Sequence, residues 1–482
     1  MANQSIKSKN KYLLKNTLLF SIGSIGSKVL FFLLVPLYTN FLSTTDYGYA
    51  DTVTTFVGLI VFFLTLNVAD AVLRFVIERK GDENGILSFA IRVWAIGSLL
   101  LAASTIVFSF FDLIRWPIYC YYFLIIYFAL YSLNDILNNF LKGIDKVKDV
   151  VIAGLITTLV TILLNIIFIV FLKKGLIGYF VSLCGGLLTS CFYCSFRIGK
   201  PLFLFWREKV CKEKIKLMLI YCLPLIFNGI GWWANNSIDK YFVIAICGQS
   251  ENGIYSISYK IPTILTVFAS IFAQAWNLSA IKNYDKEDKD GFFSKIYAYY
   301  GAFLVIVCSL LILFNKYIAL FLFAKDFYIA WKCSSILLIS IIFSSLSGFL
   351  GSVFAAAKQS RIFALSTIVS AIINCALNFA LIPIIGIIGA AIATSISFTA
   401  IWIIRLICVK KYIKLKIDLT RDIVAYLLIV VQCFLEHLDG FVAFVQLMIV
   451  FLLCLIYLKE IKELSKKSMV LVKGIFVKKR DC

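Results

Sequence analysis

The chain has 482 residues, of which 61% are hydrophobic and 16% aromatic, and its 47 Lys and Arg against 26 Asp and Glu leave a formal net charge of +21. So apolar a composition excludes a soluble globular domain, and recurring apolar runs of about 20 residues indicate α-helices that cross a bilayer. The sequence does not show the short segments of alternating apolar and polar residues that are typical of a membrane β-barrel. The basic residues lie in short loops between apolar runs, which favours a membrane surface over nucleic acid as the reason for the charge.

Fourteen apolar segments are predicted to span the membrane. In chain order they are roughly 16–41, 50–74, 87–111, 118–141, 150–172, 176–196, 217–246, 254–281, 297–314, 333–357, 362–383, 387–408, 421–436 and 441–458. With the N-terminus placed inside, the great majority of the Lys and Arg residues fall in or beside the loops of that one side. This alternation predicts a multi-pass membrane protein with both termini in the cytoplasm.

The longest inner loop is strongly basic and divides the spans into two sets of six or more. We therefore predict an all-α polytopic membrane protein built of two six-helix bundles with two additional helices. The expected divisions are 1–198 for the N-terminal bundle, 199–216 for a cytoplasmic linker, 217–410 for the C-terminal bundle, 411–458 for the two additional helices and 459–482 for a basic cytoplasmic tail.

The two halves show weak internal similarity. Asp46-Tyr-Gly-Tyr49 corresponds to Glu251-Asn-Gly-Ile-Tyr255, and Gly175-Leu-Ile-Gly178 corresponds to Gly386-Ile-Ile-Gly389, at offsets of 205 and 211 residues. An even number of spans separates each pair, so the halves have the same orientation in the membrane. This predicts parallel bundles related by an axis along the membrane normal, an arrangement in which transporters bind substrate between the halves.

Four basic residues are predicted to line a hydrated central cavity. Lys28, Lys240 and Lys260 lie within predicted spans, where charges rarely face lipid, and Arg74 lies near the inner mouth. Such cations would neutralise an anionic substrate headgroup. For Arg74, a side chain that reaches the membrane interface is an equally good interpretation.

Acidic and amide side chains within the spans are candidates for cavity polarity or for ion coupling by H⁺ or Na⁺. They are Asp70, Asp135, Asp239 and Asn235. Asp70 and Arg74, four residues apart, share a helix face, whereas the neighbours Asp239 and Lys240 point about 100° apart on a helix. For the Asn residues, interhelical hydrogen bonding is the more common role.

Several motifs for catalysis and metal binding are absent from the sequence, and no loop is long enough to fold into a catalytic domain. It contains no GxxxxGK[ST] phosphate loop, no HExxH, and no paired Cys and His ligand set, so no cofactor, no metal and no ATP hydrolysis are expected. Its cysteines lie mostly within apolar runs and are interpreted as small buried hydrophobic residues. We therefore expect a transporter rather than an enzyme.

Three stretches resemble one family. Pro36-Leu-Tyr-Thr-Asn-Phe-Leu-Ser-Thr-Thr-Asp-Tyr-Gly-Tyr49, the series Leu223-Pro224, Asp239-Lys240 and Gly253-Ile-Tyr255, and Pro383-Ile-Ile-Gly-Ile-Ile-Gly-Ala-Ala-Ile-Ala-Thr394 resemble, in order, segments of bacterial polysaccharide (O-antigen repeat-unit) flippases. These belong to the multidrug/oligosaccharidyl-lipid/polysaccharide exporter superfamily, and the likeness covers about residues 10 to 410.

The resemblance implies a function and partners. It implies alternating access by two bundles that export undecaprenyl-pyrophosphate-linked oligosaccharide across the bacterial inner membrane, for surface polysaccharide such as O-antigen or capsule. A coupling ion and neighbouring polysaccharide polymerase and glycosyltransferase proteins are implied partners, and nucleic acid is not. The cations Lys28, Lys240 and Lys260 would then contact pyrophosphate or acidic sugars.

Two alternatives remain from the sequence. A multidrug cation antiporter of the same fold would favour acidic cavity residues, and Asp70, Asp135 and Asp239 are set against the three lysines. An oligosaccharide polymerase or ligase has a similar number of spans, but such enzymes carry a large outer loop with catalytic Arg or His, and no such loop occurs in this sequence.

Overall fold

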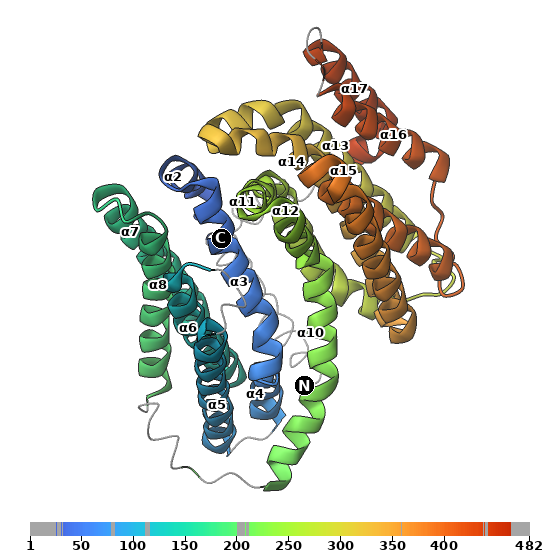
Figure 1. Cartoon of the computed structure of the whole chain (residues 1–482). Coiled ribbons are helices and arrows are strands. Elements are labelled where there is room, and N and C mark those ends of the chain that lie inside the picture. Colours follow the sequence, from blue (N-terminus) through green and yellow to red (C-terminus); the bar gives the residue numbers. More distant parts are fainter. Residues whose placement is uncertain are drawn as a thin grey trace, which may run out of the picture. The chain divides into compact units, whose positions relative to one another are not determined.

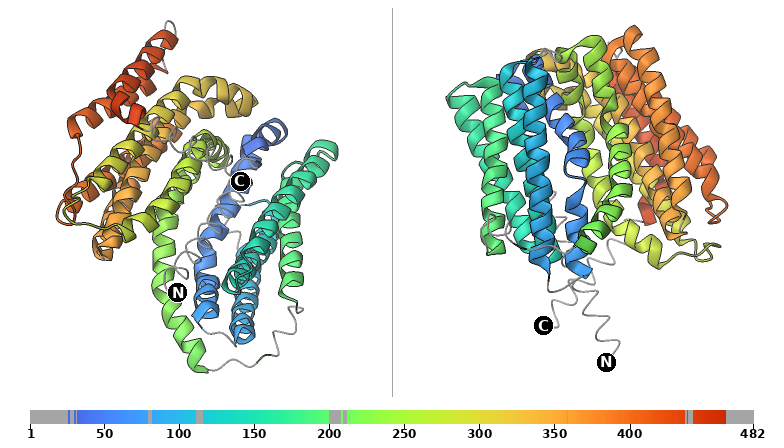
Figure 2. Two further views of the ribbon diagram at one scale, coloured as in Figure 1. Left: turned by 180° about the vertical axis from the view of Figure 1, so that it is seen from behind. Right: turned by 60° about the horizontal axis from the view of Figure 1, so that its bottom comes forward.

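A computed structural model describes residues 26, 30, 32–78, 82–110, 116–199, 208, 212–357, 359–436, 438 and 442–463. Every regular element within these ranges is a helix (Figure 1). The chain divides into two compact units, one of residues 1–241 with 248–253 and the other of residues 242–247 with 254–482. Within each unit the long helices run alongside one another (Figure 2).

The first unit contains the helices α2 to α8 and most of α10. Their bounds are α2 Val35–Phe41, α3 Thr44–Leu64, α4 Val68–Glu78, α5 Glu83–Phe110, α6 Ile118–Gly143, α7 Val147–Asn165, the π-helical η1 Ile166–Phe171, α8 Gly175–Ile198 and α10 Lys212–Cys247. Local sequence sets several ends. The Ser43 hydroxyl accepts a hydrogen bond from the Asp46 amide and caps α3. Gly199, in the left-handed conformation, ends α8.

The core of the first unit lies where α4, α5, α6, α8 and α10 meet. Val72, Leu87, Leu137 and Cys194, one from each of α4, α5, α6 and α8, are fully buried there. The thiol at Cys194 behaves as a small hydrophobic group in this setting, as the sequence predicted for the cysteines of apolar runs.

The second unit contains α12 to α17, and α11 crosses the division between the units. The bounds are α11 Gln249–Ser258, α12 Lys260–Lys282, α13 Phe292–Leu322, the 3₁₀ helix η2 Lys325–Ala330, α14 Trp331–Ala356, α15 Ser360–Val409, α16 Leu419–Leu435 and α17 Val442–Ile456. Aromatic rings join α12, α13 and α14. The rings of Phe272 and Tyr300 stack at 3.8 Å, those of Trp276 and Phe349 stack at 4.1 Å, and the Trp276 indole N–H donates to the Phe349 carbonyl.

The 50 residues of α15 form two helical segments rather than one. Ile385 and Gly386 have non-helical backbone angles, and Gly386 has φ of +59° after Pro383. Proline removes a helical hydrogen bond and glycine accepts the positive φ, so this turn interrupts the helix. The break falls between the predicted spans 362–383 and 387–408, as the sequence pattern indicated.

Ten helices in the described ranges are long and apolar enough to cross a membrane, and α17 is a shorter apolar helix. Because α15 covers two predicted spans and α16 and α17 coincide with two more, the structure is consistent with about fourteen spans. Most of the first predicted span, 16–41, lies outside the described residues. The second, 50–74, is not continuous, since α3 and α4 are separated at Thr65–Asn67.

Candidate functional site

The interruption between α3 and α4 is an unusual backbone feature of the first unit. Leu66 and Asn67 both have φ of +51°. Neither is glycine, and such a conformation costs about 1–2 kcal/mol per residue. The α5 helix passes close by, because a Cβ on Gly97 would overlap the Leu64 carbonyl. Broken helices of this kind build substrate and ion sites in many transporters.

Polar side chains gather on the α4 side of this break. The Asn67 Nδ2 donates to Asp70 Oδ2 at 2.9 Å. From the packed helix α6, Asn139 Nδ2 donates to Asp135 Oδ1 at 3.1 Å, and Asp70 and Asp135 are close enough for their charges to interact. The structure thus brings together two of the predicted acidic residues, from α4 and α6.

Arg74 lies on an exposed face of α4, where its charge is paired with a carboxylate. Its Nε is 2.9 Å from Glu78 Oε1, the guanidinium lies 4.8 Å from the centre of the Tyr221 ring, and the side chain is 52% exposed. These contacts connect α4 to α10. A direct role for Arg74 in binding substrate stays a prediction.

Lys240 of α10 forms an ion pair with Asp51 of α3. The Lys240 Nζ lies 2.8 Å from Asp51 Oδ1, and the two side chains are 15% and 16% exposed. Asp239 is buried and its Oδ1 accepts a hydrogen bond from the Lys240 backbone amide. The partner of the Lys240 ammonium is therefore Asp51 rather than its sequence neighbour, as the 100° separation on a helix led us to expect.

Asp51 was not among the sequence candidates. It is the second residue of the predicted span 50–74, where a carboxylate is normally taken as solvated. In the structure α3 begins seven residues earlier, at Thr44, because Ser43 caps it. The carboxylate is consequently two turns into the helix and faces α10.

Beyond this ion pair, α3 and α10 make further contacts toward the C-terminal end of α3. The Trp233 indole N–H donates to the Thr55 carbonyl at 2.9 Å, and a Cβ on Gly229 would overlap the Phe62 ring. The predicted site residue Asn235 instead bonds within its own helix, through Nδ2 to the Gly231 carbonyl at 3.3 Å. Its role in a cavity stays a prediction.

The two copies of the acid-glycine-aromatic motif contact each other. A Cβ on Gly48 of α3 would overlap the Gln249 carbonyl of α11, and a Cβ on Gly253 of α11 would overlap the Thr44 carbonyl of α3. In the repeat, Gly48 corresponds to Gly253 and Thr44 corresponds to Gln249, each at an offset of 205 residues. The two glycine contacts are therefore related by an approximate local two-fold axis, because each copy of the motif contributes the same two positions. Gln249–Gly253 belong to the first compact unit.

Hydrogen bonds between polar side chains stabilise this glycine contact. The hydroxyls of Thr44 and Ser250 are 2.7 Å apart, the Thr52 hydroxyl donates to Gln249 Oε1 at 2.9 Å, and Asn252 Nδ2 donates to Thr52 Oγ1 at 3.2 Å. The repeat was visible in the sequence, but nothing in the sequence indicates that its two copies touch.

The other two predicted lysines do not belong to the described part of the first unit. Lys28 lies outside the described residues. Lys260 is the first residue of α12, partly buried, and belongs to the second unit. A shared cationic cavity of Lys28, Lys240 and Lys260 therefore stays a prediction.

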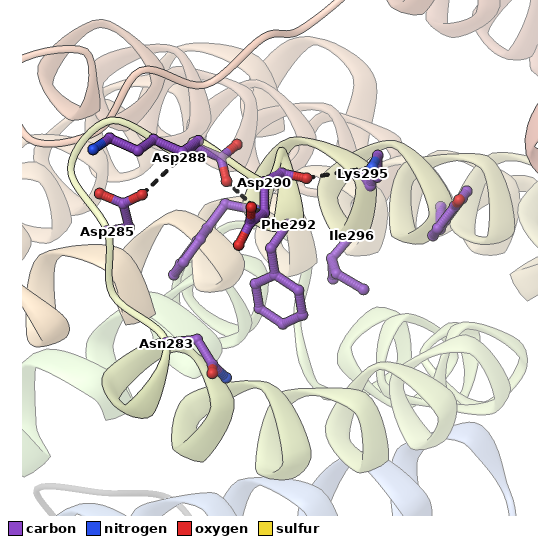
Figure 3. Close-up of a pocket in the computed structure, with 10 residues that line it drawn as sticks. Asn283, Asp285, Asp288, Asp290, Phe292, Lys295 and Ile296 are labelled. Carbon is purple, nitrogen blue, oxygen red and sulfur yellow. Dashed lines mark hydrogen bonds between the residues drawn. The ribbon is translucent and has the colours of Figure 1, made fainter.

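Two adjoining hollows lie in the second unit. One, of about 460 Å³, is at the connection between α12 and α13 (Figure 3). The other, of about 520 Å³, extends from this connection to the start of α16 and the chain after α17. The carboxylates there serve the loop itself. The amides of Lys289 and Glu287 donate to Asp285 and lower its pKa, while Asp288 accepts from the amides of Phe293 and Ser294 at the start of α13. Asp285 and Asp288, which line these hollows, therefore stabilise the loop and the start of α13 through hydrogen bonds to backbone amides.

Comparison with solved structures identifies the fold. The chain superposes on the lipid II flippase MurJ in its inward closed conformation with a TM-score of 0.68, 16% identity, and coverage of 94% of this chain and 100% of that one. An inward-facing multidrug resistance MATE transporter of the MOP superfamily gives 0.66, with 13% identity and coverage of 79% and 93%. A MOP superfamily transporter from Pyrococcus furiosus, described as having a binding pocket of reversed polarity, gives 0.54, with 13% identity and coverage of 88% and 97%. The fold is that of the MOP transporters, as predicted.

Comparison with sequences identifies the family. A probable low-salt glycan biosynthesis flippase, Agl15 of Haloferax volcanii, is 25% identical over 258 residues, which are 51% of this chain and 54% of the relative. The chain thus spans about half the length of the curated relative it matches. These relatives are flippases and transporters rather than enzymes. A family model described as polysaccharide biosynthesis protein matches residues 13–277, more than half of the sequence. The chain is a multi-pass membrane protein that belongs to the polysaccharide biosynthesis protein family.

Proposed function

We propose that the protein is a flippase for lipid-linked oligosaccharides, which carries undecaprenyl-pyrophosphate-linked repeat units across the bacterial inner membrane for assembly of surface polysaccharide such as O-antigen or capsule. Family membership supports the transport of a glycan precursor. The undecaprenyl carrier, the sugar and the bacterial inner membrane go beyond family membership, and we propose them here.

The ion pair of Lys240 with Asp51 is the observation that carries this proposal. A lysine with a side chain only 15% exposed, in a helix among apolar surroundings, requires an anionic partner. A substrate pyrophosphate is a stronger anion than a carboxylate, so it can replace Asp51 at the ammonium. Lys240 would then change partner as substrate enters, with Lys28 and Lys260 as further cationic contacts and Arg74 at the inner mouth.

Substrate binding of this kind would be coupled to alternating access. The contact of Gly48 with Gln249 and of Gly253 with Thr44 adjoins the Asp51 turn of α3, on the side that the charge pattern predicts to be extracytoplasmic. Release of Asp51 from Lys240 would free α3 to separate from α11. We propose that this contact closes the outer side and that Asp70, Asp135 and Asp239 are candidates for the coupling ion, H⁺ or Na⁺.

The experiment is flipping of a fluorescent lipid-linked oligosaccharide by the purified protein in proteoliposomes. Lys240→Ala should abolish flipping, whereas Lys414→Ala should retain it, because Lys414 forms an equally simple lysine–carboxylate pair with Glu287 at an exposed surface. Wild-type flipping by Lys240→Ala would overturn the cationic-site proposal. Glycosyl transfer by the purified protein would overturn the transporter itself and favour a polymerase or ligase.

A multidrug cation antiporter is the second candidate, and the proximity of Asp70 and Asp135 favours it. Two carboxylates beside a broken helix would suit a cationic substrate. Export of a lipophilic cation such as ethidium from cells, lost in Asp135→Asn and unaffected in Lys240→Ala, would support that alternative. Loss of flipping in Lys240→Ala, with no export of the lipophilic cation by the wild type, supports the proposed flippase.

A further inference from the structure

Glu436 is a buried carboxyl group at the end of α16. It caps the C-terminus of this helix and is 3% exposed. In the described ranges no Lys or Arg forms a salt bridge with it. A lone ionised carboxylate in apolar surroundings is costly, so the group requires either a counter-charge or a proton.

Three helices meet at this carboxyl group. From α13, Asn315 Nδ2 donates to Glu436 Oε1 at 2.8 Å and to the carbonyl of Trp331, the first residue of α14, at 2.9 Å. Since one amide nitrogen serves two acceptors, these contacts fix the orientation of the Asn315 amide. Ser335 of α14, fully buried, lies beside both Glu436 and Cys433 of α16.

The charged group that faces Glu436 from α13 is Lys316, but its ammonium lies 4.5 Å from the centre of the Trp331 ring. The other titratable neighbour is the thiol of Cys433 on α16, and α14 presents the Ser335 hydroxyl and the Trp331 carbonyl. A cation over an aromatic ring is held there by the ring itself. Lys316 therefore acts on Glu436 only at a distance.

The groups that can donate to Glu436 are neutral. They are the Asn315 amide at Oε1 and the Ser335 hydroxyl, which lies beside the carboxyl group. Within the described residues Oε2 has no hydrogen bond of good geometry. Neutral donors do not balance a buried negative charge, whereas a proton on Oε2 would remove it. We propose that Glu436 binds a proton at the junction of α13, α14 and α16.

At the opposite end of α16, buried carboxylates have a guanidinium as counter-charge. Arg421 Nη2 lies 2.9 Å from Asp422 Oδ1, Arg421 also pairs with Glu460 of the chain after α17, and the Tyr457 hydroxyl donates to Asp422. These carboxylates are as buried as Glu436 but have a guanidinium partner. They serve as internal controls.

Proton release from Glu436 would leave an uncompensated charge, so it requires α16 to move away from α13 and α14. By the charge pattern this junction lies near the extracytoplasmic side, where a proton is available. The junction thus links proton binding to the position of α16. The inference is independent of the transported substrate.

The experiment is labelling of the full-length protein in liposomes with dicyclohexylcarbodiimide, which reacts with protonated carboxyl groups in apolar sites. Peptide mass spectrometry should find the adduct on Glu436 and not on Asp422 or Glu460. Labelling should fall about tenfold per pH unit once the pH exceeds the midpoint of the carboxyl group. Glu436→Gln, which resembles the protonated form, should keep the wild-type melting temperature, whereas Glu460→Gln should lower it.

Absence of the adduct at every pH from 5 to 9, together with a melting temperature of Glu436→Gln as low as that of Glu436→Ala, would overturn the proposal, because the ionised form would then be required. Protection of Glu436 by NaCl but not by choline chloride at constant pH would also overturn it. That result would assign the site to a metal cation instead of a proton.

Discussion

Gly48 and Gly253 are packed against each other's motifs, 205 residues apart in the sequence. At each of these positions a side chain would collide with the backbone of the other motif. The collision is with the carbonyl of Gln249 in one case and of Thr44 in the other. A glycine at each position lets α3 and the first turn of α11 approach to backbone contact. The repeat therefore has a physical reason: both copies form one symmetric contact.

Alanine at either glycine should open this contact. Gly48→Ala or Gly253→Ala inserts a methyl group where a backbone carbonyl lies, and overpacking of this kind costs about 1–3 kcal/mol. The Thr44 and Ser250 hydroxyls are 2.7 Å apart, so Thr44→Cys with Ser250→Cys should form a disulfide on mild oxidation, detectable by mass spectrometry. Adding Gly48→Ala should reduce the cross-linked fraction. Gly154→Ala is the control, because no atom lies within 4 Å of its Cβ; an equal loss in that variant would contradict the explanation.

The ion pair between Lys240 and Asp51 should behave as a coupled unit. Asp51→Ala alone leaves a mostly buried ammonium without its carboxylate, and we expect a loss of about 1–3 kcal/mol, less than for a fully buried pair because some solvent reaches both groups. Asp51→Leu with Lys240→Met should restore much of the lost thermal stability while eliminating flipping. Additive losses in the double variant would show that the two side chains do not interact.

The architecture could largely be predicted from the sequence, and the exceptions share one cause. Apolar segments, basic loops and the turn at Gly386 depend on local composition, which a sequence displays. The break at Leu66 has neither Gly nor Pro at its centre, and it involves the close approach of α5 at Gly97 and the local hydrogen bond of Asn67 with Asp70. Asp51 and Arg405, which was not a sequence candidate either, lie near the ends of predicted spans. Their burial depends on which helices pack around them, and local sequence patterns do not indicate those tertiary contacts.

The strained turn between α3 and α4 gives a prediction about local backbone energy. Leu66 has φ of +51° and a side chain that is 37% exposed, so Leu66→Gly removes the strain without leaving a large cavity. We expect the thermal stability to stay constant or to rise by about 1 kcal/mol. Gly97→Ala should have the opposite effect, since its Cβ would overlap the Leu64 carbonyl. Equal destabilisation by both variants would argue against strain at Leu66.

Arg405 provides a test of how the second unit stabilises a buried cation without a carboxylate. The side chain is 3% exposed, and its guanidinium donates to the Ser366 hydroxyl at 3.0 Å and to the Ser347 carbonyl at 2.9 Å. It also donates to Thr367 Oγ1 at 2.9 Å and lies 4.2 Å from the centre of the Phe363 ring.

Lysine cannot reproduce this planar set of donors, so Arg405→Lys should destabilise the protein by about 2 kcal/mol or more despite the unchanged charge. Thermal melting in detergent measures the loss. Arg361→Lys, at the start of α15 and exposed, is the matched control and should melt as the wild type does. If Arg405→Lys also melts like the wild type, the charge alone is sufficient, and the hydrogen bonds between α14 and the two segments of α15 contribute little to holding them together.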